Sequence, residues 1–282
     1  MARGIYLTLG LNAVDPARYD NWDGRLNACE NDARDMAAIA QQAGFSGTVL
    51  LTADATSTRL LEELHDAAGK LASGDMLVLG YSGHGGQVGD VTADEEDGLD
   101  ETWCLYDRMV VDDELYAMWS HFRPGVRILV LSDSCHSGTM AKLALYQAGG
   151  PAAALAGIAT GDKAAAAGVK AIPFKQSWDL YLKDKPMYDA LQYVAGKEAQ
   201  STVAASVILI SGCQDNQLSL DGEKNSMFTG MLKRVWDSGK YSRNYKEFRG
   251  DIVKLMPPSQ TPNYYLVGAP DLAFEAQVPF TL

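Results

Sequence analysis

The sequence has few of the features typical of proteins stabilised by structural metals or disulfides, of membrane-spanning proteins and of nucleic-acid-binding proteins. Its four cysteines form no C-x-x-C pair, which argues against structural zinc and a disulfide framework and favours reduced intracellular thiols. No apolar run approaches the ~20 residues of a membrane span, and the N-terminal MARGIYLTLGL has too short an apolar run for a signal peptide. Lys and Arg number 24 against 36 Asp and Glu, which makes nucleic acid a poor partner. We therefore expect a cytoplasmic protein with no nucleic-acid or membrane partner.

The composition is that of an ordinary globular protein. Of the 282 residues, 47% are hydrophobic and 21% are charged. A chain of this length can bury a full hydrophobic core without disulfides or structural metals. We predict a single domain over residues 1–282, made of three parts, 1–140, 141–205 and 206–282.

Short apolar runs alternate with helical patterns along the chain. Runs of Val, Ile and Leu without polar alternation indicate strands that are buried on both faces, as in a parallel sheet. Apolar residues recur at helical spacing over 36–43 and 60–71. The alternation predicts an α/β fold with an open, mainly parallel sheet flanked by helices on both faces. The expected strands are 5–11, 48–51, 76–83, 126–134, 206–212 and, more weakly, 263–268.

Residues 141–205 interrupt this alternation. The run AGGPAAALAGIATGDKAAAAGVKAIPFK at 148–175 is rich in Ala and Gly and poor in large apolar residues. It is compatible with an Ala-rich helix and surface loops, and equally with a long mobile insert. Further on, the prolines of PPSQTPNYY exclude a helix and predict that this segment leads into an edge strand.

Two short motifs follow neighbouring apolar runs. YSGHGGQ places His84 just past the third run, and SDSCHSG places Cys135 just past the fourth. The carboxyl ends of parallel strands meet at one edge of the sheet, so we expect His84 and Cys135 to face each other. A lone His or Cys is usually structural, but an imidazole beside a thiol is what Cys–His nucleophilic catalysis requires. The backbone N–H groups of Gly85 and Cys135 are candidate oxyanion donors.

Together, YSGHGGQ and SDSCHSG resemble the caspase-like cysteine peptidases of the metacaspase and orthocaspase type. The chain has Asp133-Ser134-Cys135 where animal caspases carry Gln-Ala-Cys, and His84 precedes Cys135 by about 50 residues, a caspase-type spacing. The similarity extends to LNACENDARDM, DEEDGLDETW, VVDDEL, ISGCQDNQLS and SMFTGMLKRVW. The resemblance implies a caspase-like fold with a large-subunit-like part in 1–140, a small-subunit-like part in 206–282, and endopeptidase activity.

The resemblance also implies a substrate preference. The family's S1 pocket binds the side chain that precedes the cut bond, and its walls match Cys29, Asp32, Ser82 and Asp133 here. The carboxylates imply protein or peptide substrates with Arg or Lys at this P1 position, and not Asp. Asp133 lies two residues before Cys135, so strand alternation puts both side chains on one side. An alternative role for Asp32 is that of a first-turn carboxylate that interacts with the helix dipole.

Calcium is a further implication of the resemblance, as an activator only, because the chemistry needs no cofactor. The residues that match the family's calcium ligands are Asp100, Asp112 and Asp113, and hard cations do take several carboxylate oxygens. The position of the fourth carboxylate is Lys142 here. A solvated acidic loop is therefore the alternative reading of these carboxylates.

Activation by a metal, a protein partner or processing is expected for such a domain. Family members often cut themselves between the two parts, and the candidate sites in this interval are Lys163, Lys170 and Lys175. The alternative function is a non-catalytic or weakly active caspase-fold regulator or scaffold, which the presence of both His84 and Cys135 disfavours. A nucleotide-binding domain is disfavoured as well, because SGHGGQ lacks the Lys and Ser/Thr of a phosphate-binding loop.

Overall fold

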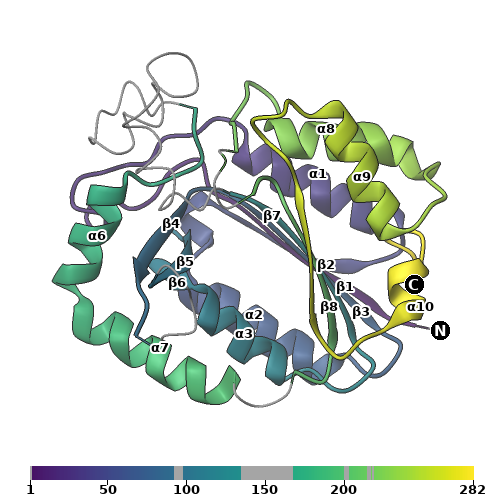
Figure 1. Cartoon of the computed structure of the whole chain (residues 1–282), viewed down its shortest axis with the longest axis horizontal. Helices are drawn as coiled ribbons and strands as arrows, with labels where there is room; N and C mark the ends of the chain where they lie inside the picture. The colour runs from purple at the N-terminus through teal and green to yellow at the C-terminus, as the bar shows by residue number, and fades with distance from the viewer. Residues whose placement is uncertain (1, 92–97, 135–167, 200–202, 215–216, 218) are drawn as a thin grey trace.

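The centre of the molecule is a mainly parallel sheet. The computed structural model describes residues 2–91, 98–134, 168–199, 203–214, 217 and 219–282. Within these residues, six strands pair in the order β2-β1-β3-β7-β8-β9 (Figure 1). The first five strands are parallel, and β9 runs antiparallel to β8 at one edge. The predicted sheet, including its weak edge strand, is confirmed.

The central strands are the continuous apolar runs of the sequence. All seven residues of β3 are buried, since helices cover the sheet on both faces. The edge strand β9 is more exposed and is the least apolar of the set. The strand bounds are β1 Gly4–Gly10, β2 Ser46–Leu51, β3 Met76–Ser82, β7 Arg127–Asp133, β8 Ser206–Ser211 and β9 Asn263–Gly268.

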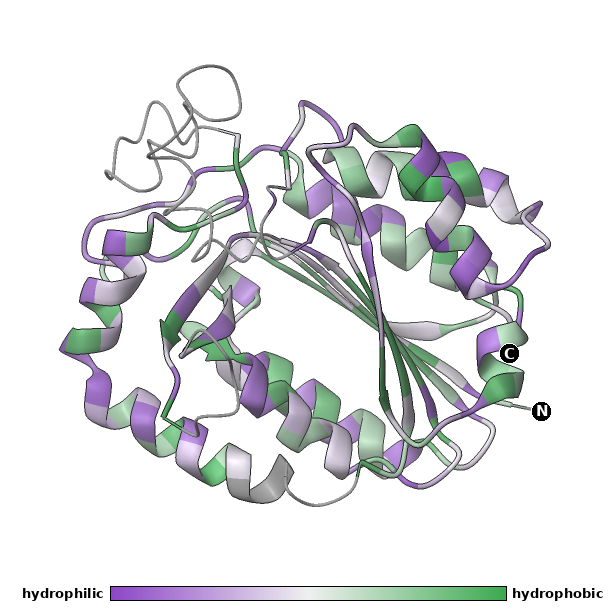
Figure 2. Ribbon diagram, in the orientation of Figure 1, coloured by the Kyte–Doolittle hydropathy of each residue, from purple (hydrophilic) through white to green (hydrophobic). Residues whose placement is uncertain are grey.

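Helices cover both faces of this sheet (Figure 1). One core forms between the sheet and α1 (Cys29–Gln42), α8 (Met227–Trp236) and α9 (Tyr245–Leu255). The other core includes α2 (Ser57–Lys70) and α3 (Asp112–Ser120). Figure 2 shows apolar residues along the central strands, whereas apolar and polar residues alternate along the helices that cover them. A short helix, α10 (Leu272–Ala276), follows β9.

A second, small antiparallel sheet lies beside the main one. It consists of β4 (Gly85–Gly89), β5 (Leu99–Cys104) and β6 (Met109–Val111). The sequence analysis did not predict this sheet, because its strands are short and β4 is Gly-rich. Tertiary packing stabilises it instead: a third core joins these strands to residues of the helix that follows Pro173.

The second half of the predicted Ala/Gly-rich insert is helical. α6 (Phe174–Lys183) contacts β4, and α7 (Lys185–Ala199) contacts α3 (Figure 1). The sequence analysis grouped these residues with the Ala-rich run before them and so did not predict these two helices. No helix in the described part of the chain is both long and apolar enough to cross a membrane.

Candidate active site

The carboxyl ends of β3 and β7 carry two polar residues side by side. Ser82 and Asp133 are partners in the parallel register of these strands. The Ser82 hydroxyl donates to Asp32 Oδ2 in the first turn of α1, at 2.8 Å. Cys29 begins the same helix, and all four of these side chains are fully buried. The structure therefore brings together the four residues predicted to form the S1 pocket.

The side chain of Lys170 fills this pocket. Its ammonium nitrogen lies 3.2 Å from Asp32 Oδ2 and 3.2 Å from Asp133 Oδ2. It also donates to the Ser82 hydroxyl at 2.8 Å, so each of its three N–H donors has an acceptor. Lys170 is 0% exposed. A fully buried lysine requires such partners, because an unpaired buried charge is strongly destabilising.

The two pocket carboxylates are held by residues from the last third of the chain. Asp133 accepts hydrogen bonds from Ser219 Oγ at 2.6 Å and from Thr229 Oγ1 at 2.9 Å. Asp32 accepts from the backbone N–H of Ser226 at 3.1 Å and from the Ser226 hydroxyl. The sequence analysis did not single out these hydroxyl residues, because isolated Ser and Thr carry no distinctive spacing. Their contacts fix both carboxylates in orientations that point at Lys170.

Burial and charge shift the pKa values of the pocket groups. Burial raises the pKa of Asp133, and the nearby Asp32 raises it further against the lowering effect of Lys170. Burial alone would lower the pKa of Lys170, but Asp133, Cys29 and Asp32 outweigh it and raise that pKa. Burial raises the pKa of the Cys29 thiol to about 12, so this thiol is not a nucleophile at neutral pH.

His84 lies just past β3 with 5% of its surface exposed. Its Nε2 is 2.9 Å from the carbonyl oxygen of Gly24, and its ring centroid is 4.7 Å from that of Trp22. Since a carbonyl only accepts, this contact assigns the proton to Nε2 and leaves Nδ1 as the acceptor. Burial lowers the pKa of His84 to about 4, although the Gly24 carbonyl and the Ala171 backbone raise it. The imidazole is therefore neutral at pH 7 and can accept a proton.

The backbone around Lys170 is extended and pairs on both sides. The Lys170 N–H donates to Ser219 O at 3.1 Å, and the Asp221 N–H donates to Gly168 O at 2.8 Å. On the other side, the Gly85 N–H donates to the Lys170 carbonyl at 3.0 Å, and the Ile172 N–H donates to Gly85 O at 2.9 Å. Gly85 is one of the two residues whose backbone N–H was predicted to donate to an oxyanion. Here its N–H contacts the carbonyl of the lysine that fills the pocket.

Comparison with known proteins identifies the family. The family model of the caspase domain (Peptidase C14) matches residues 13–270. The chain belongs to the caspase family of cysteine peptidases. This caspase-family domain is 30% identical over 256 residues to Metacaspase-1A of Aspergillus oryzae, and 32% identical over 256 residues to Metacaspase-1A of Aspergillus fumigatus. These alignments cover 80% of the chain but only 57% and 58% of the fungal proteins.

Solved structures agree with this assignment. The crystal structure of protein GSU0716 from Geobacter sulfurreducens matches with a TM-score of 0.84 and 48% identity, over 99% of this chain and 98% of that one. Caspase-1 from Spodoptera frugiperda matches with a TM-score of 0.53 and 9% identity, over 95% of this chain and 86% of that one. The second likeness shows that the caspase-family domain has the caspase fold.

Some predicted residues of the caspase-family domain lie outside the described part of the chain or away from the predicted S1 pocket. Cys135, Lys142 and Lys163 lie outside the described residues; in the sequence, Cys135 directly follows Asp133-Ser134. Lys175 lies exposed on α6, where it pairs with Asp179 one turn later. Of the two predicted processing sites that the structure describes, only Lys170 reaches the predicted S1 pocket.

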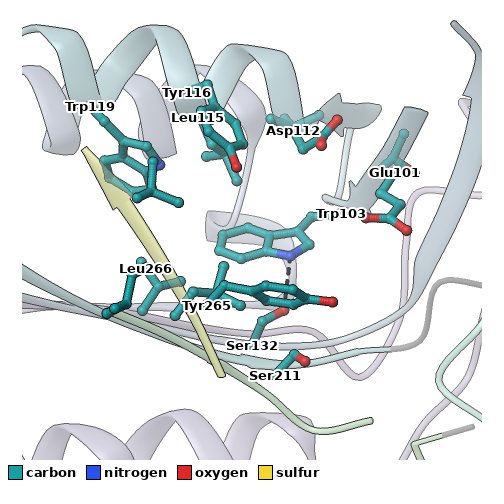
Figure 3. A pocket seen from close by; sticks show the side chains of 15 residues that line it. Glu101, Trp103, Asp112, Leu115, Tyr116, Trp119, Ser132, Ser211, Tyr265 and Leu266 are labelled. Atoms are coloured by element: carbon teal, nitrogen blue, oxygen red, sulfur yellow. Dashed lines mark hydrogen bonds between the residues drawn. The ribbon is translucent and has the colours of Figure 1, made fainter. Parts of the chain in front are cut away.

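Among the described residues, no three His, Cys, Asp or Glu side chains converge as a metal site would require, and the calcium site predicted at Asp100, Asp112 and Asp113 stays a prediction. Asp112 lines a separate pocket of about 360 Å³ between α3 and the sheet. Figure 3 shows Trp103 in this pocket, donating from Nε1 to Ser132 Oγ at 3.0 Å, with Tyr265 nearby. Ser132 precedes Asp133 on β7 and points to the opposite face of the sheet. We assign calcium no step in the chemistry.

Proposed function

We propose that this domain is a cysteine endopeptidase that cleaves after Arg or Lys, with Cys135 as the nucleophile and His84 as the proton acceptor. The observation that carries the proposal is the position of the Lys170 ammonium, 3.2 Å from each of Asp32 and Asp133. A basic P1 side chain of a substrate would use the same three acceptors, with Ser82 as the third.

The charge of the pocket supports basic specificity. Two carboxylates, Asp32 and Asp133, face the single ammonium of Lys170 in a fully buried site. One positively charged side chain in the pocket therefore leaves no excess of positive charge. An Asp side chain at P1 would place a third carboxylate beside Asp32 and Asp133. Like charges opposed across an interface cost several kcal/mol, which disfavours the specificity of animal caspases here.

The chemistry assigned to the site uses three groups. The neutral His84 takes the thiol proton at Nδ1 while the Gly24 carbonyl and Trp22 hold the ring. The Cys135 thiolate then attacks the substrate carbonyl, whose oxygen would accept from the N–H of Gly85, as the Lys170 carbonyl oxygen does. Protein and peptide substrates with a basic P1 residue follow from this assignment. Activation by calcium or a partner protein, and a cytoplasmic location, stay predictions.

The test is hydrolysis of three fluorogenic peptides that differ only in carrying Arg, Lys or Asp at P1. The wild-type chain should cleave the Arg and Lys peptides and leave the Asp peptide intact. Cys135→Ala should abolish all hydrolysis, because the covalent step is lost. Cys104→Ala is the matched control: this thiol is buried, and its loss should leave the activity per folded molecule unchanged.

Two outcomes would contradict the proposal. Cleavage of the Asp peptide at the same rate as the Arg and Lys peptides would show that the carboxylates do not determine specificity. A folded wild-type preparation with no hydrolysis of any peptide, with or without added calcium, would instead favour the scaffold reading of this fold.

A further inference from the structure

The pocket between α3 and the sheet lies on the face of the sheet opposite to the S1 pocket. Residues of α3, β5, β7, β8 and β9 line its volume of about 360 Å³. Ser132 is one of them, whereas the next residue of β7, Asp133, points to the S1 pocket on the other face. The volume falls within the range of sites for small organic ligands, about 300–1,000 Å³. The chemistry proposed for hydrolysis makes no use of this pocket.

Aromatic side chains line this pocket from two sides. Those from α3 and those from the strands β5 and β9 are Trp119, Tyr116, Trp103 and Tyr265 (Figure 3). The indole of Trp103 is fixed in place, because it stacks on the ring of Tyr81 with centroids 4.4 Å and planes 7° apart. The faces of aromatic rings are electron-rich and attract cations, those of Trp most strongly. Such walls suit a ligand that combines an apolar body with a positive charge.

Two acidic side chains line one end of the same pocket. Glu101 comes from β5, and Asp112 is the first residue of α3. In Figure 3, both lie at the end of the pocket opposite to Trp119. Asp112 also belongs to the predicted calcium set, but a hard cation takes oxygen ligands and makes no use of aromatic walls. An organic cation matches the acidic end and the aromatic walls together.

Trp103 connects this pocket to both motifs of the proposed catalytic site. Its Nε1 donates to Ser132 Oγ at 3.0 Å, and that hydroxyl lies 3.0 Å from Ser134 Oγ, in the residue directly before the proposed nucleophile. The ring of Trp103 stacks on Tyr81, whose hydroxyl donates to the carbonyl oxygen of His84 at 2.7 Å. A ligand packed against this indole therefore restrains residues beside both proposed catalytic side chains.

We propose that this pocket is an effector site for a small organic cation, with Glu101 and Asp112 facing its charge and the aromatic side chains packed on its body. The effect on hydrolysis rests on the proposed function, whereas binding does not. An occupied pocket holds Trp103 in place, and catalysis requires its groups within a fraction of an ångström of their productive positions. Occupancy therefore raises kcat for the Arg peptide. It leaves KM unchanged, because the S1 pocket lies on the other face of the sheet.

The probe for binding is para-hydroxymethyl-phenyltrimethylammonium, which carries a permanent positive charge on an aromatic body. Its nitrogen has no N–H, so it cannot replace Lys170 as a donor to the S1 acceptors. Calorimetric titration of the folded Cys135→Ala chain in EGTA should give a Kd of about 0.1–1 mM, as expected for a ligand of about a dozen heavy atoms. The uncharged isostere para-tert-butylbenzyl alcohol should bind at least about tenfold more weakly.

Variants in the Cys135→Ala chain locate the bound cation. Glu101→Gln, Asp112→Asn and Tyr265→Leu should each weaken its binding at least about threefold, since each removes one source of attraction for a positive charge. The matched controls are Asp179→Asn on α6 and Tyr193→Leu on α7, which change an exposed carboxylate and an exposed ring outside this pocket. Both should bind the cation as the unsubstituted chain does. Thermal unfolding checks that each variant is folded.

The effect on hydrolysis is measured in the chain with its cysteine intact. The cation should raise kcat for the Arg peptide at least about twofold at unchanged KM, and the alcohol at the same concentration should not. The double variant Glu101→Gln/Tyr265→Leu should hydrolyse the peptide at the basal rate of the wild type and gain nothing from the cation.

Binding and effect fail in different ways. The site is overturned if calorimetry and ligand-observed NMR show no binding, if cation and alcohol bind equally, or if all three pocket substitutions leave the affinity unchanged. Binding without a change in kcat overturns the effector role, as does a rise in KM that marks competition in the S1 pocket. A chain that binds the cation but hydrolyses no peptide with or without it contradicts the proposed function, and with it the effector role, but leaves the binding site in place.

Discussion

The charge of Asp133 can be tested without changing the size of its side chain. In Asp133→Asn, the amide oxygen can still accept from Ser219 or Thr229, but the amide N–H₂ must face the other hydroxyl and the bound cation. Truncating one partner of a buried charge pair costs ~2–5 kcal/mol. Because Asp32 keeps its charge, we expect the lower part of this range, about 2–3 kcal/mol, which corresponds to a roughly 30- to 150-fold loss in kcat/KM for Arg substrates.

The assay compares two peptides that differ in one charge. One carries Arg at P1 and the other carries citrulline, its neutral isostere, and rates are divided by the amount of folded chain. The loss in Asp133→Asn should appear with the Arg peptide and nearly vanish with the citrulline peptide. Asp35→Asn is the matched control, since Asp35 lies on α1 but pairs with Lys233 outside the pocket. An equal loss with both peptides would refute the reasoning and reduce Asp133 to a structural residue.

Two further predictions concern stability. The pKa of His84 is about 4 in the folded chain against 6.5 for an exposed imidazole, so unfolding takes up a proton as pH falls through this interval. We expect urea unfolding to show this in the variant Cys135→Ala and in the double variant Cys135→Ala/His84→Gln. Acidification from pH 7 to 4 should lower the free energy of unfolding of Cys135→Ala by about 3 kcal/mol more than that of the double variant. An equal loss in both variants would contradict the burial of this ring. Gly10→Ala should strongly destabilise the fold, because its Cβ would lie 2.2 Å from the backbone oxygen of Cys29. By contrast, Gly250→Ala in α9 meets nothing within 4 Å and should raise the free energy of unfolding by about 0.5–1 kcal/mol; stabilisation by both substitutions would contradict the packing of α1 on β1.

Much of the fold was predictable because its signals are local. A strand buried on both faces needs a continuous apolar run, and the runs at β3, β7 and β8 are unmistakable in the sequence. The small sheet was not predictable, since Gly-rich β4 and three-residue β6 have little strand propensity of their own. Those strands form because α6 and neighbouring side chains bury them.

The candidate active site was also predictable only in part. The motifs around His84 and Asp133 each lie at the carboxyl end of a strand, so the parallel topology alone puts them at one sheet edge. The sequence does not predict that the side chain of Lys170 enters the pocket. Lys170 is 138 positions from Asp32, and no local feature of the sequence distinguishes it from Lys175. Only the packed structure pairs its backbone with Ser219 and Gly85 and buries its ammonium between two carboxylates, because contacts between distant segments depend on how the whole chain folds.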